Sequence, residues 1–195
     1  YVLLGMNAYV SLPTHLRPAF ERRFETLERL GVLAPRLLST DGTPLPSCRN
    51  FPTHRNLLAS RAHFGPRNRS SVTRPYVPAE PPAFTLCDVV AGACFAVRRA
   101  TWEQLDGMDE QFFLYAEDTD LCRRAKNAGW LVGYEPAVAV RHEWRASTSQ
   151  DRRQSAQLHA QSLARYFAKH FPTRPWANRS LQWLMRAHTA FTSER

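Results

Sequence analysis

Three carboxylates lie close together in the middle of the chain, at Glu117, Asp118 and Asp120. A group of aromatic residues directly precedes them: Phe112, Phe113 and Tyr115. A carboxylate on a turn that faces a pocket can hold a hydroxyl group within hydrogen-bond reach and accept its proton as the hydroxyl oxygen attacks. General-base chemistry on a hydroxyl-bearing substrate is therefore one role that this group could have.

The residues after the carboxylates have the spacing of an amphipathic helix. Leu121, Ala125 and Ala128 fall on one face at i, i+4 and i+7. Asp120 and Arg124 are spaced i, i+4 and can pair along the helix. A glycine, Gly129, stands where a helix commonly ends in the left-handed conformation. This pattern predicts that the carboxylates lie at the positive, N-terminal end of a helix.

A simpler explanation exists for part of this arrangement. Acidic residues are common in the first turn of a helix because they accept hydrogen bonds from free N–H groups and oppose the helix dipole. That explanation accounts for one or two carboxylates. It does not account for the glycine, the aromatic run and the acidic group occurring together.

The same stretch resembles the C-terminal signature of family 2 glycosyltransferases, especially bacterial rhamnosyltransferase-like members. Their pattern runs roughly G-G-F-D-E-x-F-F-x-Y-x-E-D-x-D-L-C-x-R, followed by a Gly-Trp pair and a later histidine. The matching residues are Gly107, Asp109, Glu110, Phe112, Phe113, Tyr115, Glu117, Asp118, Asp120, Leu121, Cys122, Arg124, Gly129, Trp130 and His142. The stretches Pro35–Leu38 (PRLL) and Asp41-Gly42 also match the middle section of the family.

The resemblance implies an α/β fold, namely the C-terminal portion of a GT-A (nucleotide-diphospho-sugar transferase) fold with a helical C-terminal tail. We expect residues 1–148 to form a partial GT-A domain and residues 149–195 a helical basic tail. The chain begins at Tyr1 inside an apolar run. The N-terminal half, which binds the nucleotide in this family, is therefore expected upstream of Tyr1.

Apolar patterning predicts the elements that position these residues. Strands are expected at 1–6, at 32–38 and within 83–97, and as two short strands within 131–140, separated by Pro136. A helix is expected at 12–30, closed by Gly31, and a short one at 98–105. Residues 50–83 are rich in Pro, Arg, Ser and Asn, with a short helix near 52–62. They are interpreted as a lid or acceptor-side loop, or equally as an exposed connector. Two further helices are expected at 151–170 and 175–191.

The resemblance also assigns roles to individual residues. It makes Asp118 the general base for the acceptor hydroxyl and places Glu117 beside it, where it sets the local field. Asp120 is assigned a structural role through Arg124. The acceptor pocket would be bordered by Asp88, Gly92 and Ala93. For Asp88, a strand-end carboxylate bonded to local backbone is an equal alternative.

A divalent ion, Mg²⁺ or Mn²⁺, would neutralise the diphosphate of the donor in such an enzyme. His142 matches the late histidine of the family, which can reach the metal or the diphosphate, although a lone histidine at a strand end is often only a surface residue. The usual metal-binding Asp is replaced here by Tyr9. Because a phenol has a pKa of about 10, Tyr9 cannot replace a carboxylate at neutral pH.

The composition favours anionic partners, because 26 Lys and Arg against 17 Asp and Glu give a net charge of +9. Nucleotide phosphates, anionic lipid headgroups and nucleic acid all fit this charge. The four cysteines form no C-x-x-C pair, so a zinc site is not expected. No signal peptide or run of about 18 apolar residues is visible, and we expect a cytoplasmic protein with peripheral contact at the inner membrane face.

The sequence thus predicts a glycosyltransferase that moves a sugar, rhamnose by resemblance, from a nucleotide-diphosphate sugar to a glycan or polyprenyl-linked acceptor with inversion. The alternative is a truncated or inactive relative that keeps only an acceptor-binding or structural role. Tyr9 and the expected missing half support that alternative. A nucleic-acid binder ranks last, because no helix-turn-helix, RNA-recognition or zinc pattern accompanies the charge.

Overall fold

The computed structural model describes residues 2–6, 10–55, 83–143 and 152–192. The Asn7-Ala8-Tyr9 stretch and most of the 50–83 loop lie outside these ranges. The chain divides into two compact units. The first comprises residues 1–51, 74–109 and 118–144, and the second comprises 52–73, 110–117 and 145–195.

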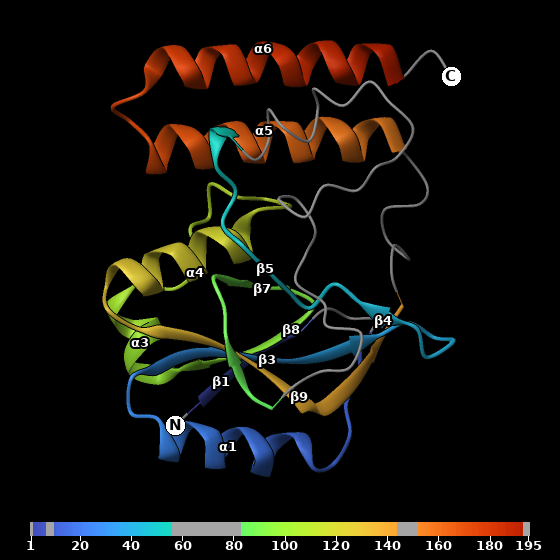
Figure 1. Cartoon of the computed structure of the whole chain (residues 1–195), viewed down its shortest axis with the longest axis vertical. Helices are drawn as coiled ribbons and strands as arrows, with labels where there is room; N and C mark the ends of the chain where they lie inside the picture. The colour runs from blue at the N-terminus through green and yellow to red at the C-terminus, as the bar shows by residue number, and fades with distance from the viewer. Residues whose placement is uncertain (1, 7–9, 56–82, 144–151, 193–195) are drawn as a thin grey trace. The chain divides into compact units, whose positions relative to one another are not determined.

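A mixed sheet forms the centre of the first unit (Figure 1). Its main path runs β1-β8-β3-β9-β2, with β4 added beside β3 and β6 beside β9. The bounds are β1 Val2–Met6, β2 Val10–Ser11, β3 Leu30–Leu38, β4 Pro44–Leu45, β6 Thr85–Leu86, β8 Cys94–Arg98 and β9 Leu131–His142. The β3–β9 pair is parallel, whereas the other pairs are antiparallel. A separate two-stranded sheet pairs β5, Cys48–Arg49, with β7, Val89–Val90.

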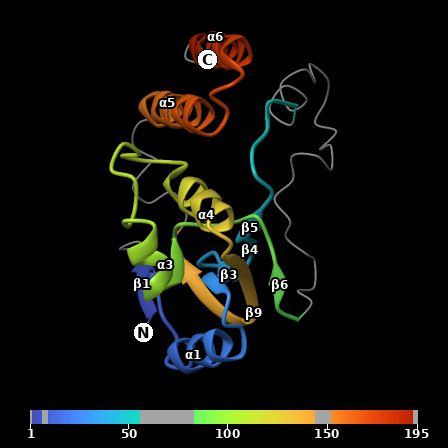
Figure 2. The same ribbon diagram turned by 90° about the vertical axis from the view of Figure 1, so that its left-hand side faces the viewer.

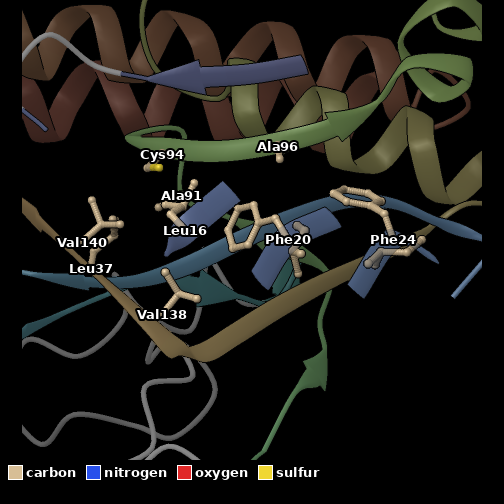
Figure 3. Packing of buried hydrophobic residues seen from close by; sticks show 11 residues of the cluster. Leu16, Phe20, Phe24, Leu37, Ala91, Cys94, Ala96, Val138 and Val140 are labelled. Atoms are coloured by element: carbon tan, nitrogen blue, oxygen red, sulfur yellow. The ribbon is translucent and has the colours of Figure 1, made fainter. Parts of the chain in front are cut away.

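Helices cover both faces of the main sheet (Figure 2). One face packs against α1, Leu16–Thr26, through Leu16, Phe20 and Phe24 (Figure 3). The opposite face packs against α4, Glu117–Asn127, and lies near the short α3, Arg99–Gln104. Within β3, Leu33 and Leu37 belong to the first core and Val32 and Ala34 to the second. This is the two-residue alternation of a strand buried on both faces.

The prediction of a helix at 12–30 closed by Gly31 is wrong in its extent. The helix ends at Thr26, and Leu30 and Gly31 already belong to β3, where Leu30 is in register with Leu131. A Cβ atom on Gly31 would lie 2.7 Å from the Cβ of Trp130. Gly31 therefore permits close approach of two chain segments and does not cap a helix.

The prediction of two short strands around Pro136 is also wrong, because β9 is one continuous strand. Its register with β3 jumps from the pair Pro35–Glu135 to the pair Arg36–Ala139, which places Pro136 in a bulge. A bulge tolerates the missing N–H of proline. The strand therefore continues to His142 at its end.

The second unit is built around an antiparallel helical hairpin, α5 (Arg152–His170) and α6 (Pro175–Thr192) (Figure 1). Its core contains Phe112, Ala116, Leu163, Tyr166, Phe167, Leu181 and Met185. Phe112 of the aromatic run and Ala116, which directly precedes α4, therefore belong to this core. None of the described helices is both long enough and apolar enough to span a membrane.

Candidate active site

The acidic residues lie at the start of α4, as the sequence predicts. Two residues just before the helix, Tyr115 and Ala116, have φ values of 67° and 61°. Such left-handed backbone costs roughly 1 kcal/mol or more for a residue other than glycine and is typically retained where the surrounding structure requires it. The sharp turn brings the chain into α4 with Glu117, half-buried, as its first residue.

Asp118 is held by hydrogen bonds to both of its carboxylate oxygens. Its Oδ1 accepts from Arg49 Nη2 at 2.7 Å and from Thr119 Oγ1 at 2.9 Å. Its Oδ2 accepts from the backbone N–H of Gly92 at 2.9 Å. The side chain is 13% exposed. Asp118 is therefore well ordered and partly accessible, which suits a group that must receive a proton from a bound substrate.

Arg49 was not among the residues singled out in the sequence. It lies 69 positions from Asp118, on β5, and it also donates to Thr119 Oγ1 at 2.9 Å. Of the residues predicted to border the acceptor pocket, Gly92 contacts Asp118 directly. Ala93 is half-buried and packs against the core on the α1 face of the sheet.

The ion pair between Asp120 and Arg124 is present, with Arg124 Nε 2.6 Å from Asp120 Oδ2. Asp120 is 0% exposed. Arg124 also donates from Nη1 to the backbone oxygens of Leu105 and Gly107, at 2.8 and 2.9 Å. The pair thus ties α4 to the turn after α3, where Gly107 has a φ of 71°.

Asp88 also has both carboxylate oxygens engaged. Lys126 Nζ lies 2.6 Å from its Oδ1, and the backbone N–H of Phe51 donates to its Oδ2 at 3.2 Å. The Phe51 ring lies beneath the Arg123 guanidinium at 4.4 Å. Asp88 thus connects Phe51, which follows β5, to Lys126 of α4. The backbone group that it binds belongs to Phe51 and is distant from Asp88 in the sequence.

His142 lies at the end of β9, opposite Val10 of β2, and is buried. Burial lowers the pKa of His142 below its ordinary value of about 6.5, so the imidazole is neutral at pH 7. A neutral imidazole can bind a metal ion or donate a hydrogen bond. The described residues contain no group of three or more His, Cys, Asp or Glu side chains that could hold a metal ion.

None of the cysteines in the described residues forms a disulfide. Burial raises the pKa of Cys94 to about 11 and that of Cys122 to about 12. Both are therefore protonated at neutral pH and belong to the apolar cores.

Comparison with known proteins finds similarity to glycosyltransferases. Residues 85–166, which include Asp88, Gly92 and the whole acidic stretch, match the model of "Glycosyltransferase like family 2". An N-acetylglucosaminyl-diphospho-decaprenol L-rhamnosyltransferase of Mycobacterium tuberculosis (strain H37Rv) is 32% identical over 170 residues, covering 85% of this chain and 53% of the relative. These matches support a rhamnosyltransferase-like protein of glycosyltransferase family 2.

Two further relatives belong to other organisms. Rhamnosyltransferase WbbL of Escherichia coli K12 is 32% identical over 44% of this chain and 32% of its own length. The hexosyltransferase Agl10 for low-salt glycan biosynthesis in Haloferax volcanii is 25% identical over 57% of this chain and 32% of its own length. The chain spans about half the length of its M. tuberculosis relative. The enzyme class that these matches support is that of the glycosyltransferases.

Proposed function

We propose that the protein containing this chain transfers a sugar from a nucleotide-diphosphate sugar to a hydroxyl group of a glycan or lipid-linked acceptor, with inversion and with Asp118 as general base. The observation that carries the proposal is the setting of Asp118. It lies in the stretch that matches the family and is held through both oxygens by Arg49, Thr119 and Gly92. The names of two relatives suggest rhamnose as the sugar, and the M. tuberculosis relative suggests a polyprenyl-diphosphate-linked acceptor.

In the proposed reaction, Asp118 accepts the proton of the acceptor hydroxyl as its oxygen attacks the anomeric carbon. The new bond from the acceptor oxygen to that carbon forms while the bond to the nucleotide diphosphate breaks, and the electron pair leaves with the diphosphate. Attack from the face opposite the leaving group inverts the anomeric configuration. Gly92 and Ala93 would border the acceptor, with Asp88 nearby, and Glu117 would set the local field.

The diphosphate requires positive charge or hydrogen-bond donors, and family 2 suggests a divalent ion in general. The described residues contain no group of three or more His, Cys, Asp or Glu side chains that could hold such an ion, so they do not by themselves fit a metal centre. We therefore derive no step through a metal. We propose His142, neutral at pH 7, as a hydrogen-bond donor to the diphosphate.

We further propose that residues 1–148 are the acceptor-side portion of a GT-A domain and that residues 149–195 are a helical tail. A mixed sheet with helices on both faces supports a GT-A-like domain. The second candidate function, an inactive relative that only binds the acceptor, is favoured by Tyr9 standing where the family has a metal-binding Asp.

The test of the proposed function compares the protein expressed from its complete reading frame with the 195-residue chain alone. We expect the former to transfer labelled rhamnose from dTDP-rhamnose to polyprenyl-diphospho-N-acetylglucosamine. We expect the chain alone to show no saturable Mn²⁺-dependent binding of dTDP- or UDP-sugars by calorimetry, because exposed charge contacts to phosphate are weak and screened by salt.

Two results would contradict these expectations. Acceptor binding without transfer from any nucleotide sugar would favour the inactive relative. Tight, metal-dependent binding of a nucleotide sugar by the isolated chain would show that it contains a complete donor site. Tyr9→Asp introduces the carboxylate that the family has at this position. We expect that the isolated chain with this substitution still does not bind a nucleotide sugar.

We also propose that α6 contacts an anionic membrane surface. Its inner side, Leu181 and Met185, is buried against α5, whereas Trp176 and Trp183 are 73% and 69% exposed. The two tryptophans are spaced i, i+7, and the exposed Arg179 lies between them. Exposed tryptophans beside basic residues are typical of helices that lie on membrane surfaces.

Replacing both tryptophans by serine should weaken binding to phosphatidylserine-containing vesicles about tenfold or more, because their apolar surface no longer leaves water. Binding of the unaltered chain should weaken as salt rises. Leu86→Ser is a matched control, since Leu86 is 51% exposed on β6. Binding of the unaltered chain, the double variant and the control to the vesicles is measured by cosedimentation.

If the double variant, or a chain ending at His170, binds the vesicles as well as the unaltered chain does, α6 is not the membrane contact. The substitutions are the cleaner test, because deletion also uncovers α5.

A further inference from the structure

The two-stranded sheet β5–β7 delivers one hydrogen-bond donor to each oxygen of Asp118. Arg49 is the last residue of β5 and is in register with Val89 of β7. Gly92 follows closely after β7. The guanidinium of Arg49 binds Oδ1 of Asp118, and the backbone N–H of Gly92 binds Oδ2. One small element thereby holds both oxygens of the carboxylate.

This small sheet is itself anchored to the main sheet. The backbone N–H of Ala91 donates to the oxygen of Ser47 at 3.0 Å, which extends the β5–β7 pairing. The hydroxyl of Ser47, which is buried, accepts from the backbone N–H of Leu37 in β3 at 2.8 Å and donates to the oxygen of Leu45. These hydrogen bonds fix the position of β5 against the main sheet, and with it the position of Arg49.

The hydrogen bonds leave the two oxygens of Asp118 unequal. An ionised carboxylate offers about four lone-pair positions, two on each oxygen. Oδ1 accepts two hydrogen bonds, from Arg49 and from Thr119. Among the described residues, Oδ2 accepts one, from Gly92. Oδ2 is thus the oxygen with an unoccupied position for a substrate hydroxyl.

We propose that Arg49 is a positioning residue for the base, because it orients Asp118 so that Oδ2 receives the proton. This inference rests on the proposed function. A hydrogen bond between a guanidinium and a carboxylate is stronger than one between neutral groups and fixes the direction of the carboxylate. In the resulting step the proton of the acceptor hydroxyl passes to Oδ2, while the acceptor oxygen bonds to the anomeric carbon and the diphosphate departs with its electron pair.

The test uses the complete protein with Arg49→Met, Arg49→Lys and Arg49→Gln. We expect Arg49→Met to lower kcat about 10- to 100-fold at neutral pH, because the base is no longer held in the productive geometry. Arg49→Lys keeps a charged donor and should restore a large part of kcat, whereas Arg49→Met should not. The KM for the acceptor should change little in each variant, because the proposed role of Arg49 is to orient the base.

Arg17→Met is the matched control, because Arg17 forms an exposed ion pair with Glu21 on α1. It should leave kcat and the KM for both substrates unchanged. If Arg49→Met does not fold, as judged by circular dichroism, Arg49→Gln provides the same comparison with a donor retained and the charge removed.

The outcomes separate the two proposals. If Asp118→Asn retains the normal rate, the assignment of the base fails, and the role of Arg49 fails with it. If Asp118→Asn is inactive but Arg49→Met keeps the normal kcat, the positioning role alone is wrong. A raised KM for the nucleotide sugar at unchanged kcat would instead make Arg49 a donor-binding residue and would overturn the inference.

Discussion

Replacing Asp118 by Asn in the complete protein should lower sugar transfer by about 10²-fold or more with little change in folding. The amide keeps the shape of the side chain, and its one oxygen can still accept from either Arg49 or Gly92, which donate to different oxygens of the carboxylate. It cannot accept the proton of the acceptor hydroxyl. The measurement is kcat for transfer of labelled sugar, with circular dichroism as the check on folding.

A suitable control is Asp106→Asn. Asp106 is exposed and has a φ of 55°, a left-handed conformation that Asn adopts as readily as Asp. The same chemical change there should leave transfer unaltered. Near-normal transfer by Asp118→Asn would show that another group removes the proton.

Replacing Asp120 by Ala should lower the free energy of unfolding by about 3–5 kcal/mol, because it leaves the partly buried charge of Arg124 without its partner. The Arg124 side chain is only 17% exposed and Asp120 is 0% exposed. The loss should appear in urea unfolding of the 195-residue chain, which needs no substrate. Because Arg124 also holds the backbone oxygens of Leu105 and Gly107, loosening is expected there too.

The chain offers a control with the same spacing. Arg99 and Glu103 form an i, i+4 ion pair whose side chains are 61% and 60% exposed. Breaking this pair with Glu103→Ala should have little measurable effect, because solvent screens exposed pairs. A comparable loss in both variants would mean that burial is not what makes the Asp120–Arg124 pair important.

Asp118 and Asp120 have different expected roles within one short acidic segment. Asp118 is partly accessible and is held by groups distant in sequence, whereas Asp120, two residues later, is buried in a local ion pair. The helix spacing places the two side chains in different directions. One position therefore faces the proposed chemistry, and the other maintains the fold around it.

The predictions from sequence that agree with the structure depend on neighbours along the chain. The helix after the acidic residues, the pairing of Asp120 with Arg124 and the left-handed Gly129, with a φ of 89°, are all found. Each involves contacts within about one turn of helix, so residue types and spacing carry the information.

Tertiary structure decided the features that depend on distant pairing. Gly31 was expected to end a helix but lies in β3, because the chain there must approach Trp130 closely. The strand β9 continues past Pro136 because β3 lies beside it on both sides of the bulge. The neighbours of Asp118 were hidden in the sequence, because Arg49 reaches it only through the pairing of β5 with β7 across the intervening chain. Periodicity identified the acidic segment, whereas the packing of strands brought together the groups that hold its proposed base.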